Sequence, residues 1–228
     1  MSHDPDMIQS VELLNRRWLS KKAFEIELSR PHSFKFKAGQ TISLMHESLK
    51  RYYSLISAPI DPTITLCLQH IPGGKLSPIL AEAETGFRLE MTGPHGYFTF
   101  TPSFRRPVFI STGTGIAPFI SFARSGITEF TLFQQAASAE EFYYQSYFRT
   151  MATRYFSCFP EAPTAELSLP NPFCGTISDC LRKNLQPGSY DFYLCGDREM
   201  IRNVTLLIDE IYPDSRVYTE IFFDSAQS

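Results

Sequence analysis

The sequence predicts a two-domain protein in which an antiparallel β-barrel is followed by an α/β domain with a parallel sheet. Up to about Phe100, short strand-like segments alternate with turn residues, a spacing typical of a small barrel. After a Pro- and Arg-containing linker, apolar strand-like runs alternate with longer helical patterns, as in a parallel sheet covered by helices. The chain has 228 residues, which is enough for one large domain or two of ordinary size, and its 43% hydrophobic content can fill a core.

The strands expected in the barrel are marked by alternating polarity or by β-branched and aromatic residues. They cover residues 23–28, 40–45, 51–57 and 64–70. A helix is expected after Pro72-Gly73-Gly74, because Ser77-Pro78 is a favourable helix start and apolar residues follow it. The first domain is therefore expected over residues 1–102.

The α/β domain is expected over residues 103–228. Its first strand, 108–110, leads into a Gly-rich turn and a helix through Phe122. The strand 130–133 precedes a long helix over 139–151, the strand 190–195 precedes a helix over 199–211, and residues 217–223 form a closing strand. Residues 159–172 contain several prolines and are expected to be a surface loop, with room for one short strand before it.

Composition excludes several classes of protein. A formal net charge of −3 disfavours a nucleic-acid binder, which needs clustered Lys and Arg. Neither a membrane-spanning stretch nor a signal peptide is apparent, so a cytoplasmic location is expected. The five cysteines, Cys67, Cys158, Cys174, Cys180 and Cys195, lack the spacing of zinc or iron–sulfur sites, so we expect reduced thiols and no metal.

Two motifs lie in the expected barrel. In the strand Arg51–Ser57, Arg51 and Tyr53 share one face, whereas Tyr52 and Ser54 share the other; by itself, this is most simply an ordinary aromatic-rich strand. The segment Ile71–Pro78 combines two glycines, Lys75 and Ser77 at a helix start. Free N–H groups at such a place bind anions, with a diphosphate as the sharper interpretation, although a plain turn with a helix cap fits as well.

Three motifs lie in the expected α/β domain. A strand, a turn with Gly113, Thr114 and Gly115, and a helix occur in the order of a nucleotide-binding turn, but Pro118 replaces the third glycine of the dinucleotide fingerprint. A second strand and turn end at Cys195-Gly196. Because the carboxyl ends of adjacent parallel strands border one crevice, both turns could contact one ligand. Near the C-terminus, Glu220 stands close to two phenylalanines, which alone would indicate core packing.

Taken together and in this order, these motifs resemble the ferredoxin–NAD(P)H reductase superfamily, with a flavin-binding barrel followed by a nicotinamide-binding α/β domain. The resemblance runs from about Lys37 to Phe223. The family pattern Arg-x-Tyr-Ser-x-x-Ser is met by Arg51, Tyr53, Ser54 and Ser57. The run Gly-Lys-Leu-Ser-Pro at 74–78 is particularly similar to bacterial ferredoxin/flavodoxin reductases.

The resemblance implies bound FAD, with Tyr53 stacked on the isoalloxazine ring, and NADH or NADPH as the electron donor. The implied catalytic residues are Ser54, Cys195 and Glu220, with Ser54 near the reactive flavin nitrogen and Cys195 near the nicotinamide. The implied flavin-binding residues are Arg51, Tyr52, Tyr53, Ser54, Cys67, Leu68, Gln69, His70, Gly74, Lys75, Leu76 and Ser77. Gly113, Thr114, Gly115, Cys195 and Gly196 would bind the nicotinamide dinucleotide, and Phe222 or Phe223 would cover the flavin.

One departure from the family concerns the donor. NADP-preferring relatives carry basic residues after the second and third strands of this domain, where residues 133–141 here have no base and residues 155–181 have no Lys or Arg. Glu161 falls about where a Ser-Arg pair is expected. Because a 2′-phosphate gains most from Arg and is repelled by carboxylates, we expect NADH to be favoured.

The expected electron acceptor is a separate carrier protein, such as a ferredoxin, a flavodoxin or an oxygenase component, because the chain has no cysteine-rich module of its own. Bases available to meet an acidic carrier are Lys21, Lys22, Lys35, Lys37, Lys50, Arg51, Arg105 and Arg106. Two alternatives stay open. One is a flavin reductase that uses free flavin as a substrate; the other is a non-catalytic flavin-binding interaction module.

Overall fold

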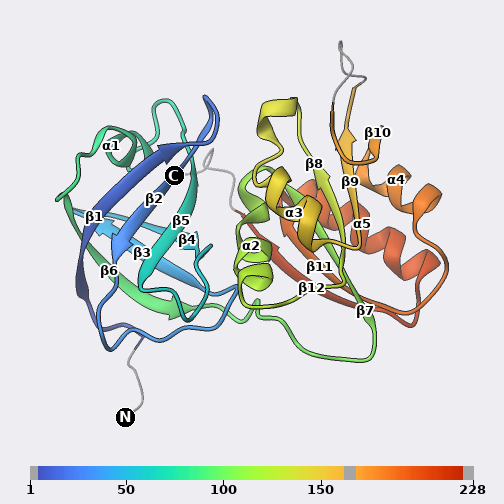
Figure 1. Cartoon of the computed structure of the whole chain (residues 1–228), viewed down its shortest axis with the longest axis horizontal. Coiled ribbons are helices and arrows are strands. Elements are labelled where there is room, and N and C mark those ends of the chain that lie inside the picture. Colours follow the sequence, from blue (N-terminus) through green and yellow to red (C-terminus); the bar gives the residue numbers. More distant parts are fainter. Residues whose placement is uncertain (1–4, 162–167, 223–228) are drawn as a thin grey trace. The chain divides into compact units, whose positions relative to one another are not determined.

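A computed structural model describes residues 5–161 and 168–222 of the chain. The chain divides into two units, residues 1–100 with 117–126 and residues 101–116 with 127–228. An antiparallel six-stranded sheet forms the first unit and a parallel six-stranded sheet with helices forms the second (Figure 1). The predicted fold class is therefore confirmed.

The first unit is a barrel whose strands follow the spatial order β4-β3-β6-β1-β2-β5. A bridge between Leu55, directly after β4, and Leu66 of β5 joins the two ends of this order, so the sheet closes on itself. The strands are β1 Gln9–Trp18, β2 Ala23–Ser29, β3 Thr41–His46, β4 Leu49–Ser54, β5 Thr63–Gln69 and β6 Arg88–His95, and the helix α1 covers Ser77–Glu82.

The predicted strand 51–57 is wrong at its end, because β4 stops at Ser54. The chain changes partners there. Leu55 N–H still donates to the carbonyl of Gln40, 3.0 Å away, but Ile56 N–H donates to the carbonyl of Thr65 at 2.9 Å. This exchange from β3 to β5 closes the barrel and ends the regular pairing before Ser57.

Apolar side chains from β1, β2, β3, β5, β6 and α1 fill the barrel, and the partly buried Leu49 and Tyr53 of β4 pack against them. The helix α2, Ala117–Arg124, groups with this unit and is buried along nearly its whole length. Ser121 Oγ donates to the carbonyl of Ser57 at 2.7 Å, and the ring of Phe122 stacks on Phe98, with centroids 5.9 Å apart. These contacts fix α2 beside the segment that follows β4.

The second unit is a parallel sheet in the order β10-β9-β8-β7-β11-β12. The chain runs outward from β7 through β8 and β9 to β10, and then returns to the other side of β7 as β11. The strands are β7 Arg106–Thr112, β8 Thr131–Gln135, β9 Arg154–Phe159, β10 Pro172–Cys174, β11 Tyr190–Gly196 and β12 Arg216–Ile221. This reversal puts a topological switch point between β7 and β11, where open sheets of this kind bind ligands.

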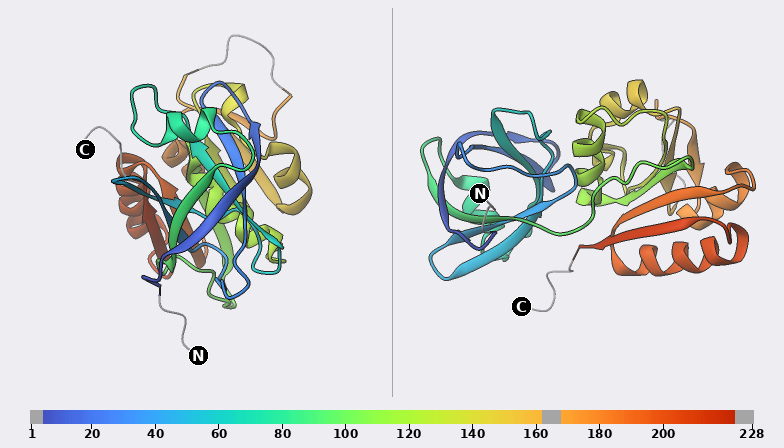
Figure 2. Two further views of the ribbon diagram at one scale, coloured as in Figure 1. Left: turned by 90° about the vertical axis from the view of Figure 1, so that its left-hand side faces the viewer. Right: turned by 90° about the horizontal axis from the view of Figure 1, so that it is seen from below.

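Helices cover both faces of this sheet. Helices α4, Ile177–Asn184, and α5, Arg198–Ile211, pack on the face where Val108, Ile110 and Leu194 lie among aromatic rings such as Phe133 and Phe156. On the opposite face, Phe130 stacks on Phe109 and also contacts Phe148 of α3, Gln145–Met151. Figure 2 shows α5 lying along one face of the sheet.

The prediction of one long helix over 139–151 is wrong. A short 3-10 helix covers Ala139–Glu141, and α3 begins only at Gln145, after Tyr144 adopts a left-handed backbone with φ of 60°. Phe142 turns inward and its ring packs on Phe159 at 4.9 Å between centroids. Burial of this aromatic ring interrupts the helix between Glu141 and Gln145. The contact with Phe159 is distant in sequence, so a local helical pattern cannot predict it.

The closing strand predicted over 217–223 is found as β12, which ends at Ile221. None of the helices in the described part of the chain combines the length and the apolar character needed to cross a membrane.

Candidate active site

Arg51 and Tyr53 lie together on one face of the edge strand β4, as the alternation predicts. Burial raises the pKa of the Tyr53 phenol to about 12, and the nearby Arg51 guanidinium partly opposes this shift. Arg51 Nη1 donates to the carbonyl of Lys50 at 2.8 Å, which leaves other guanidinium N–H groups for an anion. Tyr53 is therefore a neutral aromatic side chain beside a permanent positive charge.

Tyr52 and Ser54 occupy the opposite face of β4 and differ in exposure. Ser54 is buried, with 3% of its surface exposed, whereas Tyr52 is 58% exposed. The Tyr52 ring is held on two sides, by the edge of His95 at 5.5 Å and by the Lys50 ammonium at 5.4 Å. Tyr52 thus forms part of an exposed aromatic and basic surface rather than of the interior.

The segment Gly74–Ser77 folds back on Ile71. Gly74 N–H donates to the Ile71 carbonyl at 2.9 Å, and Ser77 Oγ accepts from Ile71 N–H at 3.2 Å. The Ser77 O–H remains available to donate. At the start of α1, Leu76 provides no side-chain cap and a proline occupies the first turn, so the N–H groups of this segment suit an anionic ligand.

In residues 67–70 and in residues 74–77, some predicted flavin-binding residues can offer a ligand only their backbone atoms. Leu68 and Leu76 are each 1% exposed and belong to the barrel core, so only their backbone atoms are available to a ligand. Cys67 is also buried, whereas Gln69 is exposed and His70 is intermediate. β5 stands at the end of the strand order, and its pairing with the segment after β4 stops near Leu66.

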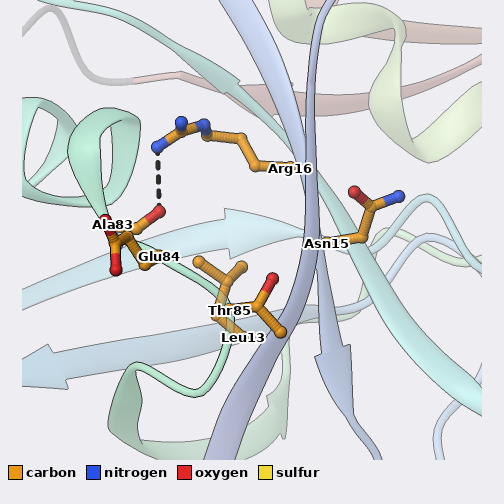
Figure 3. Close-up of a pocket in the computed structure, with 6 residues that line it drawn as sticks. All are labelled: Leu13, Asn15, Arg16, Ala83, Glu84 and Thr85. Atoms are coloured by element: carbon orange, nitrogen blue, oxygen red, sulfur yellow. Dashed lines mark hydrogen bonds between the residues drawn. The ribbon is translucent and has the colours of Figure 1, made fainter.

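Two pockets on the barrel are formed by other residues. One, of about 340 Å³, is lined by Leu13, Asn15, Arg16, Ala83, Glu84 and Thr85 (Figure 3). The Arg16 guanidinium there donates to the carbonyl of Ala83 at 2.9 Å, so its charge already has a partner. The second pocket, about 450 Å³, is bordered by Met45, His46 and Arg88 among others. Neither pocket contains a predicted site residue.

In the α/β unit, the two glycine turns meet at the switch point. Cys195 pairs with Ser111 across β11 and β7, and the turn Gly113–Ile116 follows directly after β7. A Cβ on Gly115 would overlap the Cys195 carbonyl, and a Cβ on Gly196 would overlap Thr112 Oγ1. The predicted nearness of the two turns is thus present, and close backbone packing by itself requires glycine at both positions.

Two polar residues that the motifs did not single out lock this junction. Asp197 caps α5 by accepting from Met200 N–H at 2.8 Å. Thr112 Oγ1 donates to the other Asp197 carboxylate oxygen at 2.8 Å and accepts from Asp197 N–H at 3.0 Å. The sequence signal was an Asp directly before a helix start, but its partner on β7 depends on the tertiary fold.

Cys195 and Glu220 face each other across β11 and β12. The Sγ atom lies 4.0 Å from Glu220 Oε2, and Cys195 is fully buried whereas Glu220 is partly exposed. Burial, and then the Glu220 carboxylate, raise the pKa of the Cys195 thiol well above its usual value. Cys195 is therefore a neutral thiol and a weak hydrogen-bond donor, not a nucleophile.

A row of mostly polar side chains, called the polar level below, crosses the sheet at the position of Cys195 and Glu220. The register aligns Glu220, Cys195, Ser111, Gln134 and Ser157 on five neighbouring strands. One level below on the same face, the aligned residues are Tyr218, Tyr193, Phe109, Leu132 and Tyr155. The sheet thus changes from aromatic to polar near its carboxyl edge, next to the glycine turns.

The two glutamines at the end of β8, Gln134 and Gln135, make hydrogen bonds within the protein. Gln134 accepts from the Tyr155 hydroxyl at 2.5 Å and donates to the Tyr143 carbonyl at 3.4 Å. Gln135 accepts from Ile177 N–H, the first residue of α4, at 3.2 Å. Carboxylates near this edge are those of Glu140 and Glu141 after β8, Glu161 after β9 and Asp179 in the first turn of α4.

At the C-terminus, Phe222 N–H donates to the Gly196 carbonyl at 3.0 Å, which places its backbone next to Cys195-Gly196. Phe223 lies outside the described residues.

The predicted docking bases separate into different environments. Arg105 donates to Ser189 Oγ at 2.9 Å, and Arg106 lies over the Tyr190 ring, 5.0 Å from its centroid. Both side chains therefore attach the segment before β7 to the start of β11. Lys50 is exposed beside Tyr52. Burial, and then Lys50, lower the pKa of His95, against an opposing effect of Asp6.

The residues present fit a flavin dinucleotide and a nicotinamide dinucleotide in their donor chemistry. Arg51, Lys75 and the uncapped start of α1 provide donors for a diphosphate, and Tyr53 provides a neutral ring. In the other unit, the polar level and the glycine turns stand at the edge where open sheets bind dinucleotides.

Two family models match consecutive parts of the chain. Residues 11–100 match the oxidoreductase FAD-binding domain, and residues 109–205 match the oxidoreductase NAD-binding domain. A crystal structure of a ferredoxin NADP+ reductase from Neisseria gonorrhoeae with bound FAD and NADP shares the fold, with a TM-score of 0.83 and 22% identity, over 95% of this chain and 99% of that one.

Curated relatives match over shorter segments. Ferredoxin–NADP reductase B of Sorangium cellulosum is 38% identical over 101 residues, which are 42% of this chain and 41% of the relative. Reductase component 1 of terephthalate 1,2-dioxygenase from Comamonas sp is 36% identical over 90 residues, 38% of this chain and 27% of the relative. The aligned segments thus span less than half of either relative. From both domain models and the shared fold, the chain belongs to the ferredoxin–NAD(P)H reductase superfamily of FAD- and NAD-binding oxidoreductases.

Proposed function

We propose that this protein is an NADH-dependent flavoprotein reductase that binds FAD in residues 1–102, binds the nicotinamide dinucleotide in residues 103–228, and passes electrons to a carrier protein. The observation that supports this most directly is the switch point of the parallel sheet. There the glycine turn after β7 packs on Cys195 and Gly196, beside the Cys195–Glu220 pair. Such an edge suits a dinucleotide.

When bound, FAD would supply the redox chemistry, which is hydride acceptance and electron release. The chain binds, orients and excludes water. Tyr53, neutral below a pKa of about 12, offers its ring to the isoalloxazine, and buried Ser54 offers a hydroxyl to hydrogen-bond the flavin. Arg51 and the segment Gly74–Ser77 hold the diphosphate.

Cys195 and Glu220 act at the nicotinamide side. As a neutral, fully buried thiol, Cys195 gives a small surface for the ring to lie against without adding charge. The Glu220 carboxylate accepts from this thiol, and its partial exposure lets it exchange protons with water. Thr114 and its flanking glycines contact the rest of the coenzyme, and Phe222 or Phe223 covers the flavin.

NADH is the favoured donor. The loops that follow β8 and β9 offer carboxylates, Glu140, Glu141 and Glu161, and no base at residues 136–148 or 155–181. A 2′-phosphate would therefore meet repulsion without Arg pairing, whereas the ribose hydroxyls of NADH can donate to carboxylates.

The acceptor is an acidic carrier protein. Its support is the exposed pair Lys50 and Tyr52, a cation and an aromatic ring on the strand that also carries Arg51 and Tyr53. The partly buried His95 contacts the Tyr52 ring and holds it in place. The Comamonas relative is by name the reductase component of a dioxygenase, which agrees with an oxygenase component as one possible acceptor.

Absorption spectra of the purified protein before and after anaerobic addition of NADH test the flavin, the donor and hydride transfer. The expected result is a yellow protein that NADH bleaches. A colourless protein that rapidly reduces added riboflavin would instead identify a flavin reductase using free flavin. If the protein binds both flavin and NADH but the flavin is never reduced, it is a non-catalytic module.

Steady-state rates with NADH and NADPH test the donor. We expect the NADH:NADPH ratio of kcat/KM to exceed one and to fall about 3- to 10-fold in the double variant E140Q/E141Q, because two like charges near the 2′-phosphate are removed. The variant D209N removes an exposed acid near the end of α5 and should leave the ratio unchanged. A preference for NADPH in the unaltered protein refutes the assignment.

Reduction of a plant-type ferredoxin and of a flavodoxin, both acidic, tests the acceptor. The rate with either is expected to fall as salt rises, and K50E should lower it while ferricyanide reduction by NADH is retained. Unchanged carrier reduction in K50E would remove this surface from the docking site.

A further inference from the structure

Trp18 is the chain's single tryptophan and stands at the last position of β1. It is 45% exposed although its ring is fixed on two sides. The indole centroid lies 5.1 Å from the buried ring of Phe24 and 5.5 Å from His70, which meets it edge-on at 80°. A large aromatic ring held in place with open surface is suited to stacking on a flat ligand.

A series of contacts connects this ring to the candidate diphosphate segment, residues 74–77. His70 N–H donates to the Lys22 carbonyl at 2.8 Å, which ties the end of β5 to the hairpin between β1 and β2. The next residue, Ile71, receives Gly74 N–H at its carbonyl and donates its own N–H to Ser77 Oγ. Trp18 is thus separated from residues 74–77 only by His70 and Ile71.

Charge around the ring suits a nucleotide. Lys21 and Lys22 on the hairpin and Lys75 in the candidate diphosphate segment are all exposed. An acid on the neighbouring strand, Glu25, is paired with Arg17 at 2.6 Å, which reduces its repulsion of an anion. The region therefore combines an open aromatic ring with exposed cations.

Resting on the proposed FAD binding, we infer that Trp18 and His70 form the adenine subsite of the dinucleotide. The adenine ring stacks on the open surface of Trp18, and the adjoining diphosphate lies over residues 74–77 with Lys75 beside it. This assigns to the β1–β2 hairpin a role that none of the cofactor motifs includes. It also explains why a tryptophan is left half open at the end of a barrel strand.

Titration of the flavin-free protein with FAD and with FMN tests the inference, because FMN lacks the adenosine part. In W18A the dissociation constant for FAD should rise by about 5- to 100-fold, the range of base–aromatic stacking, while that for FMN stays unchanged. W18F should recover most of the FAD affinity. The matched control Y97A removes a fully exposed aromatic ring of the same unit and should change neither constant.

A second readout uses ADP, which has no flavin absorption. Because Trp18 provides all tryptophan emission, ADP should quench the fluorescence, and FAD should compete with it. Unchanged FAD affinity in W18A, or an equal loss of FAD and FMN affinity in both W18A and W18F, overturns the inference while leaving flavin binding intact. An unaltered protein that binds neither flavin overturns both proposals. Quenching by a carrier protein but not by ADP would make Trp18 part of a protein interface and also refute the adenine subsite.

Discussion

Adding a methyl group to the glycines at the sheet edge tests why they are glycines. The φ of Gly115 lies outside the left-handed region, but a Cβ there would overlap the Cys195 carbonyl. Gly196 has a φ of +148° and its Cβ would also overlap Thr112 Oγ1. Gly126 has a φ of +92° with nothing within 4 Å of its Cβ. An alanine therefore introduces steric overlap alone at Gly115, overlap together with backbone strain at Gly196, and backbone strain alone at Gly126.

The expected losses in unfolding free energy follow from these geometries. G115A should cost about 1–3 kcal/mol, as for overpacking against atoms that cannot move aside. G126A should cost about 1–2 kcal/mol from the left-handed backbone. G196A combines both effects and displaces the hydroxyl that bonds Asp197, so we expect about 3–5 kcal/mol.

Urea unfolding of the flavin- and coenzyme-free proteins, followed by circular dichroism, provides the measurement. NADH affinity of each folded variant is measured in parallel. The reasoning is refuted if G115A and G196A are as stable as the unaltered protein but bind NADH poorly. That outcome would mean that the glycines serve only the approach of the coenzyme and that the turns can separate without cost.

Three further predictions concern individual side chains. S54A should slow the reduction of bound flavin by NADH in stopped-flow absorbance by about 10-fold or more, with little change in flavin affinity, since a positioned hydrogen-bond donor contributes at this level; equal rates would remove Ser54 from the mechanism. Because the folded-state pKa of Tyr53 is about 12 against 10 when unfolded, stability should fall as pH rises from 10 to 12, and Y53F should show a smaller fall in alkaline urea titrations. S103A leaves the buried Asp191 carboxylate without the Ser103 hydroxyl that it accepts from and should cost about 1.5–3 kcal/mol, whereas S103T should restore most of it.

Much of the fold was predictable because its signals are local. The alternation along Ala23–Leu28 and the Gly-Lys-Leu-Ser-Pro run at 74–78 depend on residues next to one another, and they predicted β2 and the start of α1. The order of two domains followed from the change from strand-like segments to alternating strands and helices. Where a distant partner decides, local patterns failed: β4 ends at Ser54 because the chain changes partners, and Phe142 breaks a helical pattern by packing on Phe159.

By itself, the sequence determined the fold class, the order of the motifs and the residue types available at each of them. Only the tertiary structure decided what surrounds those residues. The register of β11 and β12 places Cys195 beside Glu220. Close backbone packing requires glycine at positions 115 and 196. The end of β1 leaves the Trp18 ring partly exposed beside His70. The physical reason is that register, burial and pKa depend on atoms distant in sequence, whose positions are set by the packing of the whole sheet.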